Sequence, residues 1–280
     1  MPEIRIAREA GACYGVERAL QMVESAADEQ SGAVHTLGPL IHNPRVVAEL
    51  AEKGVDAVDA PEQAAGDTLL LRTHGTVPAE EARARELCAR VLDATCPFVK
   101  KVHLAAERLS GEGYQVVVVG EAGHPEVEAT LPHAPGAVVV GSAEEAAGLP
   151  RTRKVGVVVQ TTARRALLAD VVETLLGRAE EVRVINTICE ATAGHQAAAE
   201  ELAREADVMI VIGGRISANT TRLAEISAAH CPLTHHVEGA DELRPEWFEG
   251  AGVIGITAGA STPASQIEAV RAEIERLVGE

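Results

Sequence analysis

Three cysteines occupy similar short loops, each directly before a stretch in which apolar residues recur at helical spacing. They are Cys13 in GACYG, Cys96 in DATCP and Cys189 in NTIC, at near-equal intervals along the chain. A helix N-terminus presents free N–H groups and about half a positive charge, which favours a thiolate over a thiol. A single free cysteine is often only a small buried apolar residue. The shared context of all three instead indicates three soft ligands of one centre, supplied by three similar lobes.

The residue types leave the kind of metal centre open. Structural zinc sites are normally closed by four ligands, often in Cys-x-x-Cys pairs, and no such pair occurs in this sequence. A [4Fe–4S] cluster is usually held by four cysteines, so three would leave one iron open to bind a substrate and act as a Lewis acid. Cys88 and Cys231 lie in other contexts, and we predict that both are structural.

Polar side chains follow several of the predicted strands, where ligands of parallel α/β sheets bind. These residues are His42, His74, His124, Glu126, Thr161, Ser217, Asn219 and Ser261. Except for Glu126 they can all donate hydrogen bonds, and with backbone N–H groups at helix starts they are typical of a phosphate site. No Gly-x-Gly-x-x-Gly loop and no Walker-type loop is present, so NAD and ATP are unsupported.

Glu126 is the candidate proton donor among these residues. It lies two positions after His124, across Pro125. Negative charge from a nearby cluster and diphosphate would disfavour ionisation of its carboxyl group and raise its pKa. A carboxyl group that stays protonated near neutral pH suits general acid catalysis.

The pattern of apolar residues predicts strands that alternate with helices along the whole chain. Near-continuous Val and Ile runs are typical of strands buried on both faces, so we expect mostly parallel α/β sheets. The expected strands are 4–7, 33–37, 68–72, 115–119, 138–140, 154–159, 182–185, 207–212 and 252–256. The expected helices are 16–27, 46–53, 78–90, 97–109, 164–176, 190–205, 221–229 and one that begins at 263. We expect three packed lobes, at residues 1–96, 97–188 and 189–280.

Composition limits the classes of partner. The formal net charge is −17, which argues against a nucleic-acid surface because such a surface needs a basic stripe. No apolar run reaches the roughly 18 residues of a membrane span, and the N-terminus shows no signal-peptide core. Five cysteines without a secretory signal favour reduced thiols in the cytoplasm. We therefore expect a cytoplasmic protein with no nucleic-acid or membrane partner.

Eight motifs, in order along the chain, resemble a known family of iron–sulfur enzymes. They are GACYGVERA at 11–19, LIHN at 40–43, THG at 73–75, DATCP at 93–97, GHPEV at 123–127, QTT at 160–162, TIC at 187–189 and AGAS at 258–261. The chain resembles the 4-hydroxy-3-methylbut-2-enyl diphosphate reductases of the non-mevalonate isoprenoid pathway over essentially its whole length.

That resemblance implies a trefoil of three pseudo-equivalent α/β lobes around a central [4Fe–4S] cluster bound by Cys13, Cys96 and Cys189. It implies that Glu126, Thr161 and His124 are catalytic, with Glu126 as the proton donor and Thr161 orienting the substrate hydroxyl. The residues implied to bind the substrate are His42, His74, His124, Thr161, Ser217, Asn219 and Ser261. The implied reaction removes the allylic hydroxyl reductively to give isopentenyl and dimethylallyl diphosphates. A ferredoxin or flavodoxin would supply the electrons.

Four residues depart from the pattern of that family: Ala12, His195, Ile216 and Ala218. A diverged paralogue that acts on another diphosphate is therefore one alternative. A non-catalytic iron–sulfur redox sensor would explain the cysteines but not the ring of polar donors. A third alternative is a three-cysteine cluster enzyme acting on dicarboxylates, which would need Arg or Lys for its substrate.

Overall fold

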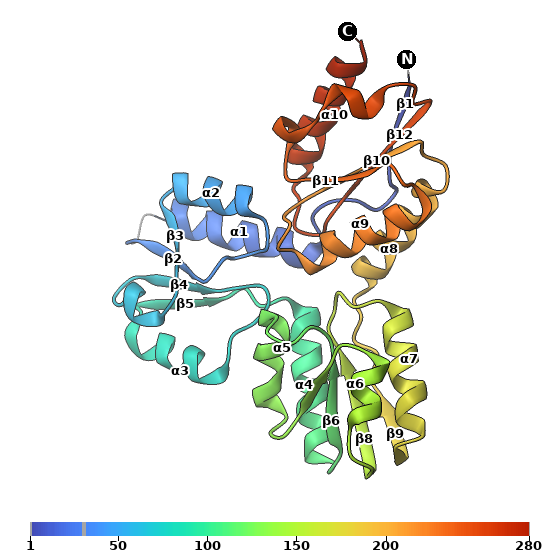
Figure 1. Cartoon of the computed structure of the whole chain (residues 1–280). Coiled ribbons are helices and arrows are strands. Elements are labelled where there is room, and N and C mark those ends of the chain that lie inside the picture. The colour runs from blue at the N-terminus through green and yellow to red at the C-terminus, as the bar shows by residue number, and fades with distance from the viewer. Residues whose placement is uncertain (1, 30–31, 280) are drawn as a thin grey trace. The chain divides into compact units, whose positions relative to one another are not determined.

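The computed structural model describes residues 2–29 and 32–279 (Figure 1). Within these residues the strands form three separate sheets of four strands, and all pairings are parallel. Helices connect successive strands, as parallel pairing requires. The prediction of three α/β lobes with parallel sheets is thus confirmed.

The sheet of the middle third shows how a run of valines builds two cores at once. Its strands, in the order β7-β6-β8-β9, are β6 (Gln115–Val119), β7 (Val138–Val140), β8 (Thr152–Val159) and β9 (Ala179–Val184). Successive side chains of a strand point to opposite faces. Val117 and Val119 therefore join one core, and Val116 and Val118 join the other.

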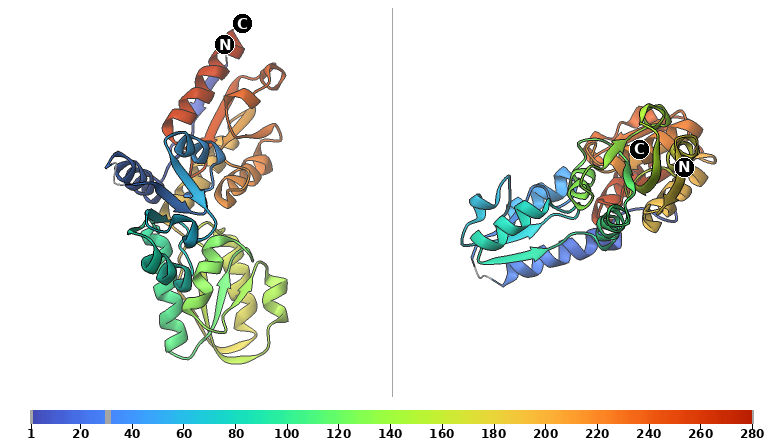
Figure 2. Two further views of the ribbon diagram at one scale, coloured as in Figure 1. Left: turned by 90° about the vertical axis from the view of Figure 1, so that its left-hand side faces the viewer. Right: turned by 90° about the horizontal axis from the view of Figure 1, so that it is seen from below.

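Helices cover both faces of this sheet, and the turned views of Figure 2 show the same layers. The helices are α4 (Pro97–Gly111), α5 (Pro125–Thr130), α6 (Ala143–Gly148) and α7 (Arg165–Leu176), with a 3-10 turn at Leu131–His133. The core on the α4 side contains Leu109, and the core on the α7 side contains Val171 and Leu175. The valines of β6 are thus buried on both faces of the sheet.

A second sheet has the order β3-β2-β4-β5 and belongs mainly to the first third of the chain. Its strands are β2 (Val34–Leu37), β3 (Val55–Val58), β4 (Thr68–Leu71) and β5 (Arg90–Asp93). The helices of this part are α1 (Tyr14–Asp28), α2 (Pro44–Glu52) and α3 (Pro78–Leu87), with a 3-10 turn at Pro61–Ala64. Leu69 and Leu71 pack against Ala84 of α3, which fixes that helix on one face.

The third sheet combines the C-terminal third with the first strand of the chain. Its order is β1-β12-β10-β11, from β1 (Glu3–Ile6), β10 (Val208–Ile212), β11 (Thr234–Val237) and β12 (Val253–Ala258). The helices are α8 (Glu190–Ala203), α9 (Ala218–His230) and α10 (Ala264–Gly279), with 3-10 turns at Ala240–Glu242 and Pro245–Phe248. Ile210 and Ile256 share a core with Val270 and Ile274 of α10. On the other face, Met209 packs against Leu202 of α8.

The three sheets share one topology when each is followed from the strand that precedes a cysteine. The orders are then β1-β12-β10-β11, β5-β4-β2-β3 and β9-β8-β6-β7. Strands β1, β5 and β9 lead into Cys13, Cys96 and Cys189. In the third lobe this strand is β1, from the N-terminal end of the chain, whereas the other three strands come from the C-terminal third. The four-stranded unit of this lobe is therefore continuous in the folded protein but not in the sequence.

Contacts divide the chain into two compact units, which we describe separately. Unit 1 comprises Met1–Glu17, Ile41–Glu49 and Glu190–Glu280, and unit 2 comprises Arg18–Leu40 and Leu50–Cys189. Unit 1 contains the sheet of β1, β10, β11 and β12, and unit 2 contains the other two sheets. The lobe boundaries at 96/97 and 188/189 stay a prediction.

Local differences from the expected elements have simple causes. The helix expected to reach residue 90 ends at Leu87, with Cys88 as its extended C-cap, because Arg90–Asp93 is strand β5. Strands β3, β5 and β11 were not predicted. They are edge strands with partly exposed polar residues, such as Asp56 and His235, so they lack the apolar run of a central strand.

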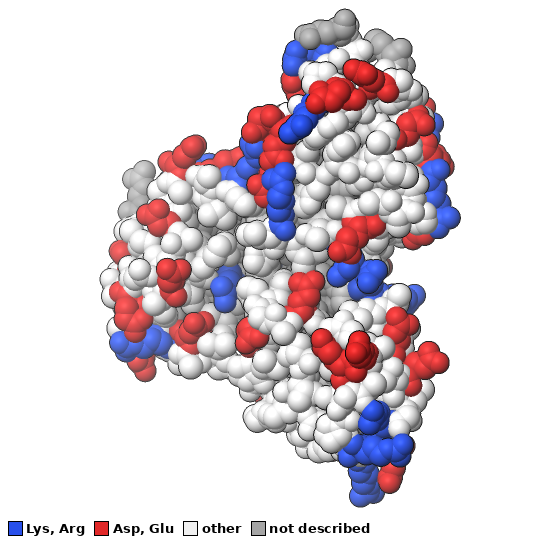
Figure 3. Space-filling model, viewed as in Figure 1, with Lys and Arg blue, Asp and Glu red and all other residues white. Residues whose placement is uncertain are grey.

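The surface is rich in mixed charge. On the face drawn in Figure 3, acidic and basic side chains lie close to one another, with uncharged areas between the groups. Exposed ion pairs such as Arg108–Glu112 and Arg271–Glu275 contribute to this pattern. No helix in the part of the chain that the structure describes is long and apolar enough to cross a membrane.

Helix α4 allows a matched test of this packing. Leu109 is fully buried, whereas Leu104 on the same helix is 64% exposed. We expect Leu109→Ala to lower the free energy of unfolding by about 2–5 kcal/mol, since it removes buried methyl groups and leaves a cavity. Leu104→Ala should change it by less than about 0.5 kcal/mol. Chemical denaturation of both variants measures the difference, and equal effects would contradict the described core.

Candidate active site

Each of the three cysteines is fixed by the same backbone hydrogen bond. Its N–H donates to a carbonyl in the loop that follows the neighbouring strand of its sheet. The pairs are Cys13 with Ala260 at 3.1 Å, Cys96 with Thr73 at 2.9 Å and Cys189 with Thr161 at 3.1 Å. The three thiols therefore stand at corresponding positions, each beside a loop that also contains a predicted substrate residue.

The thiols have the chemistry that a cluster ligand needs. All three are half-buried and are thiols rather than disulfides. Each lies next to a helix start, and Cys96 is itself the N-cap of α4, followed by Pro97 in the first turn. Among the described residues, no three His, Cys, Asp or Glu side chains are grouped as ligands of one metal ion. Cys96 and Cys189 belong to unit 2 and Cys13 to unit 1.

The Glu126 carboxyl group is buried and held by Thr161 through both oxygens. Glu126 is only 2% exposed. Its Oε1 accepts from the Thr161 backbone N–H at 2.6 Å, and its Oε2 pairs with the Thr161 hydroxyl at 2.7 Å. Thr161 follows β8 and Glu126 lies in the first turn of α5, after β6. Adjacent parallel strands thus bring together two residues that are 35 positions apart.

Burial raises the pKa of the Glu126 carboxyl group above its ordinary value, and the two hydrogen bonds from Thr161 oppose that rise. A raised pKa was predicted, but from neighbouring negative charge. The structure gives a different cause, because burial penalises the charged form of an acid without any ligand present. Burial therefore favours the protonated form of the Glu126 carboxyl group in the ligand-free protein.

His124 is oriented by the backbone of Glu126. It is the N-cap of α5, and its Nδ1 accepts from the Glu126 N–H at 3.1 Å. In the neutral ring the proton must then be on Nε2, which leaves that nitrogen as a donor. The ring of His74 packs edge-on against that of His124, with centroids 5.7 Å apart. These two predicted ligands of the diphosphate are thus brought together in unit 2.

The loop that contains His74 depends on a glycine and a buried histidine. Gly75 has φ +82°, and a Cβ at this position would lie 2.9 Å from Cε1 of His103. The Gly75 carbonyl accepts from Nε of Arg72 at 3.3 Å. His103 stacks on His133, and burial lowers its pKa to about 4, so it is neutral at physiological pH. His103 was not predicted to be near the site.

In unit 1 the loops that contain His42, Ser217, Asn219 and Ser261 pack directly on one another. The Ser261 hydroxyl donates to the His42 carbonyl at 3.3 Å. A Cβ at Gly214 would lie 2.6 Å from that same carbonyl oxygen, so only glycine permits this approach. Ser217 caps α9, where its hydroxyl accepts from the Thr220 N–H at 3.3 Å. These four predicted residues therefore form one group.

Asn219 provides the clearest sign of a missing polar ligand. It is 4% exposed, and neither its amide oxygen nor its amide nitrogen has a hydrogen-bond partner among the described residues. An unpaired buried amide costs free energy, so native structures rarely leave one. Both atoms belong to a residue in the first turn of α9, where an anion is favoured by the helix dipole. The residues present thus fit a phosphate group.

Three of the four residues that differ from the expected family pattern lie in different surroundings. The Ile216 side chain is 60% exposed, and Ala218 is the first residue of α9. His195 is buried on α8, and burial lowers its pKa.

Two residues that hold loops of the candidate site in place, Asn43 and Gln160, were given no role in the sequence analysis. Asn43 is buried and caps α2, since its Oδ1 accepts from the N–H groups of Arg45 and Val46. Gln160 holds the loop after β6, because its Oε1 accepts from the Glu121 N–H at 3.0 Å. The Asn-Pro step at positions 43 and 44 is a helix-start signal that could have identified the first residue. Gln160 has no comparable helix-start signal beside it in the sequence.

Comparison with curated proteins gives close relatives over the whole chain. A protein of Geotalea uraniireducens named 4-hydroxy-3-methylbut-2-enyl diphosphate reductase is 49% identical over 278 residues, which covers 98% of each chain. A protein of the same name from Aquifex aeolicus is 45% identical over 281 residues, covering 99% of this chain and 97% of the relative.

Solved structures agree with these relatives. A structure of (E)-4-hydroxy-3-methyl-but-2-enyl diphosphate reductase, described as the terminal enzyme of the non-mevalonate pathway, shares 46% identity and a TM-score of 0.72, covering 99% of this chain and 100% of that chain. The E-1-hydroxy-2-methyl-but-2-enyl-4-diphosphate reductase of Plasmodium falciparum shares 25% identity with a TM-score of 0.91. The match covers 98% of this chain and 88% of that chain. The LytB protein family matches residues 4–275. On these grounds the chain belongs to the LytB protein family.

Proposed function

We propose that this protein reduces (E)-4-hydroxy-3-methylbut-2-enyl diphosphate to isopentenyl diphosphate and dimethylallyl diphosphate. The observation that supports this most is the buried Glu126 carboxyl group, bonded through both oxygens to Thr161. A proton donor with a raised pKa is what removal of a hydroxyl as water requires at neutral pH. The reaction consumes two electrons and two protons and releases one water.

The diphosphate is bound in this proposal by six side chains that lie in loops after strands or in the first turn of the helix that follows: His42, His74, His124, Ser217, Asn219 and Ser261. Hydroxyl, amide and neutral imidazole groups can each donate a hydrogen bond to a phosphate oxygen. Bonds to an ionised acceptor are about twice as strong as neutral ones. The unpaired Nδ2 of the buried Asn219 amide, which can donate to a phosphate oxygen, supports its place in this set.

The proton on Glu126 has a defined position. Because the Thr161 N–H donates to Oε1, that oxygen acts as an acceptor, and the carboxyl proton belongs on Oε2. With Glu126 ionised, the Thr161 hydroxyl donates to Oε2 at 2.7 Å. Protonation of Oε2 reverses this hydrogen bond, so that the acid donates to the Thr161 hydroxyl oxygen. When Oε2 donates, the hydroxyl of Thr161 is free to turn its own proton toward the substrate. Thr161 thus orients the substrate hydroxyl and relays a proton to it.

Cys13, Cys96 and Cys189 are proposed to hold a [4Fe–4S] cluster, to which their position beside helix starts is suited. When bound, the cluster supplies the electrons for C–O cleavage and an open iron that acts as a Lewis acid. A ferredoxin or flavodoxin is the proposed source of electrons. A redox sensor would need neither a buried acid nor an unpaired buried amide, so these two features favour the reductase.

Removal of the acid tests the proposal directly. We expect Glu126→Gln to lower kcat by at least about 100-fold, because the amide keeps the shape of the side chain but cannot donate the proton. The measurement is anaerobic oxidation of a reduced viologen by reconstituted protein after addition of substrate. Glu128→Gln, two residues along on the exposed face of α5, is the matched control and should keep full activity. Full activity of Glu126→Gln would rule out the assigned proton donor.

The raised pKa of Glu126 also predicts a dependence of stability on pH. The folded state favours the protonated acid, so its contribution is full below the unfolded pKa and is lost as pH rises through the folded pKa. As pH rises above about 4.3, the ordinary pKa of a glutamic acid, the wild type should therefore lose stability relative to Glu126→Gln. Urea denaturation of ligand-free protein at several pH values measures this. If the difference in free energy of unfolding between the wild type and Glu126→Gln stays constant with rising pH, or grows in favour of the wild type, the raised pKa is contradicted.

The cluster ligands can be tested without activity. We expect Cys96→Ser to lose most of the bound iron and acid-labile sulfide after anaerobic reconstitution, because a hydroxyl replaces a thiolate ligand. Cys88→Ser is the control, since Cys88 is a half-buried cysteine whose Sγ contacts the Pro61 carbonyl. Equal iron and sulfide content in the two variants would exclude Cys96 as a ligand.

A further inference from the structure

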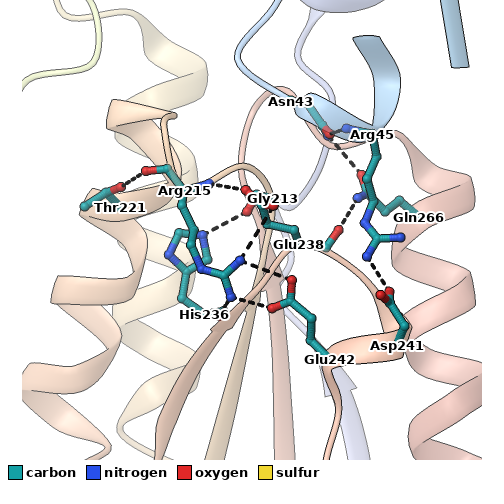
Figure 4. Close-up of polar contacts among 10 residues, drawn as sticks. All are labelled: Asn43, Arg45, Gly213, Arg215, Thr221, His236, Glu238, Asp241, Glu242 and Gln266. Atoms are coloured by element: carbon teal, nitrogen blue, oxygen red, sulfur yellow. Dashed lines mark hydrogen bonds and ion pairs between the residues drawn. The ribbon is translucent and has the colours of Figure 1, made fainter. Parts of the chain in front are cut away.

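Four neighbouring loops of unit 1 are joined by hydrogen bonds, and one of them contains no predicted substrate residue. His42, Ser217 with Asn219, and Ser261 occupy three of these loops. The fourth follows β11 and contains Glu238. Hydrogen bonds from the other parts of the unit nevertheless meet at Glu238, as Figure 4 shows.

One side of this network fixes the loop that leads to Ser217. Oε1 of Glu238 accepts from the Arg215 backbone N–H at 2.7 Å, and Oε2 lies 3.6 Å from Nη1 of Arg215. The Arg215 guanidinium is held further by both oxygens of Glu242. Nε2 of His236 pairs with the Gly213 carbonyl at 2.9 Å. The start of this loop is therefore tied to β11 and the residues that follow it.

The other side of the network fixes the loop of His42. Nε2 of Gln266 donates to the Glu238 carbonyl at 2.6 Å, while its Oε1 accepts from Nδ2 of Asn43 at 2.9 Å. Nδ2 of Asn43 also donates to the Ser261 carbonyl at 2.9 Å. Asn43 is 1% exposed and directly follows His42. Gln266, on α10, thus joins the Asn43 loop to the Glu238 loop.

The two fixed loops are in close contact, so their spacing matters. Gly214 approaches the His42 carbonyl so closely that a Cβ would lie 2.6 Å from the oxygen. Donors on both loops must reach phosphate oxygens of one ligand at hydrogen-bond distance at the same time. A binding site of this kind depends on residues outside it to hold its donors in place.

We propose that Gln266 and Glu238 are positioning residues that set the spacing between the His42 loop and the Ser217–Asn219 loop, and thereby the affinity for the diphosphate. The inference rests on the proposed function and extends it to two residues that act through others. Gln266 acts through Asn43, and Glu238 acts through the Arg215 backbone.

Gln266→Met is the first test, because methionine has a similar length but forms neither hydrogen bond. We expect KM for the substrate and Kd for inorganic diphosphate to rise about tenfold or more, because two hydrogen bonds are lost, with kcat within about threefold of wild type. Iron content and Tm should stay near the wild-type values. Ser265→Ala, exposed on the same helix, is the control and should change neither constant.

Substitutions of Glu238 separate its acceptor role from its charge. Glu238→Ala should raise KM and Kd about tenfold, whereas Glu238→Gln keeps an oxygen for the Arg215 N–H and should stay within about twofold. If both residues set one spacing, Gln266→Met combined with Glu238→Ala should raise KM little beyond the larger single effect. Unchanged KM and Kd in both single variants, or fully additive effects, would overturn the inference. Wild-type protein that neither binds diphosphate nor turns over substrate would instead overturn the proposed function.

Discussion

Burial of the Glu126 carboxyl group against Thr161 is the constraint on which the proposed active-site residues of unit 2 depend. Thr161 binds both oxygens of the acid, and its carbonyl accepts from the Cys189 N–H. One residue at the end of β8 therefore fixes the proposed proton donor and a proposed cluster ligand together. The Glu126 N–H in turn orients His124. A change in the β6–β8 register would displace all of these groups, because a one-residue slip turns every side chain to the other face.

The repeated topology explains why the cysteines are spaced so evenly. In each lobe an edge strand leads to the cysteine, and the adjacent strand ends in the loop that accepts its N–H. The valine runs predicted the central strands, because strands buried on both faces need apolar residues at every position. The sequence did not reveal that β1 pairs with β12, since that parallel pairing joins residues from opposite ends of the chain. Edge strands β3, β5 and β11 were missed because their polar residues break the apolar run.

The chemistry-bearing residues could be predicted because they follow strands, and ligands of parallel sheets bind there. The residues that support them could not. Asn43 bonds to Gln266, 223 positions away, and Glu238 bonds to Arg215 through a backbone N–H. Neither contact leaves a periodic pattern in the sequence. The cause of the raised pKa of Glu126 was equally hidden, because burial of this residue depends on packing and not on its neighbours in the chain.

We propose that the protein is a two-electron reductase of an allylic diphosphate alcohol. The most direct measurement is anaerobic turnover by wild-type protein reconstituted with iron and sulfide, with products separated by chromatography. We expect that two reduced viologens are oxidised for each substrate consumed, and that isopentenyl and dimethylallyl diphosphates are formed. Protein with a full complement of iron and sulfide that leaves both viologen and substrate unchanged would contradict it.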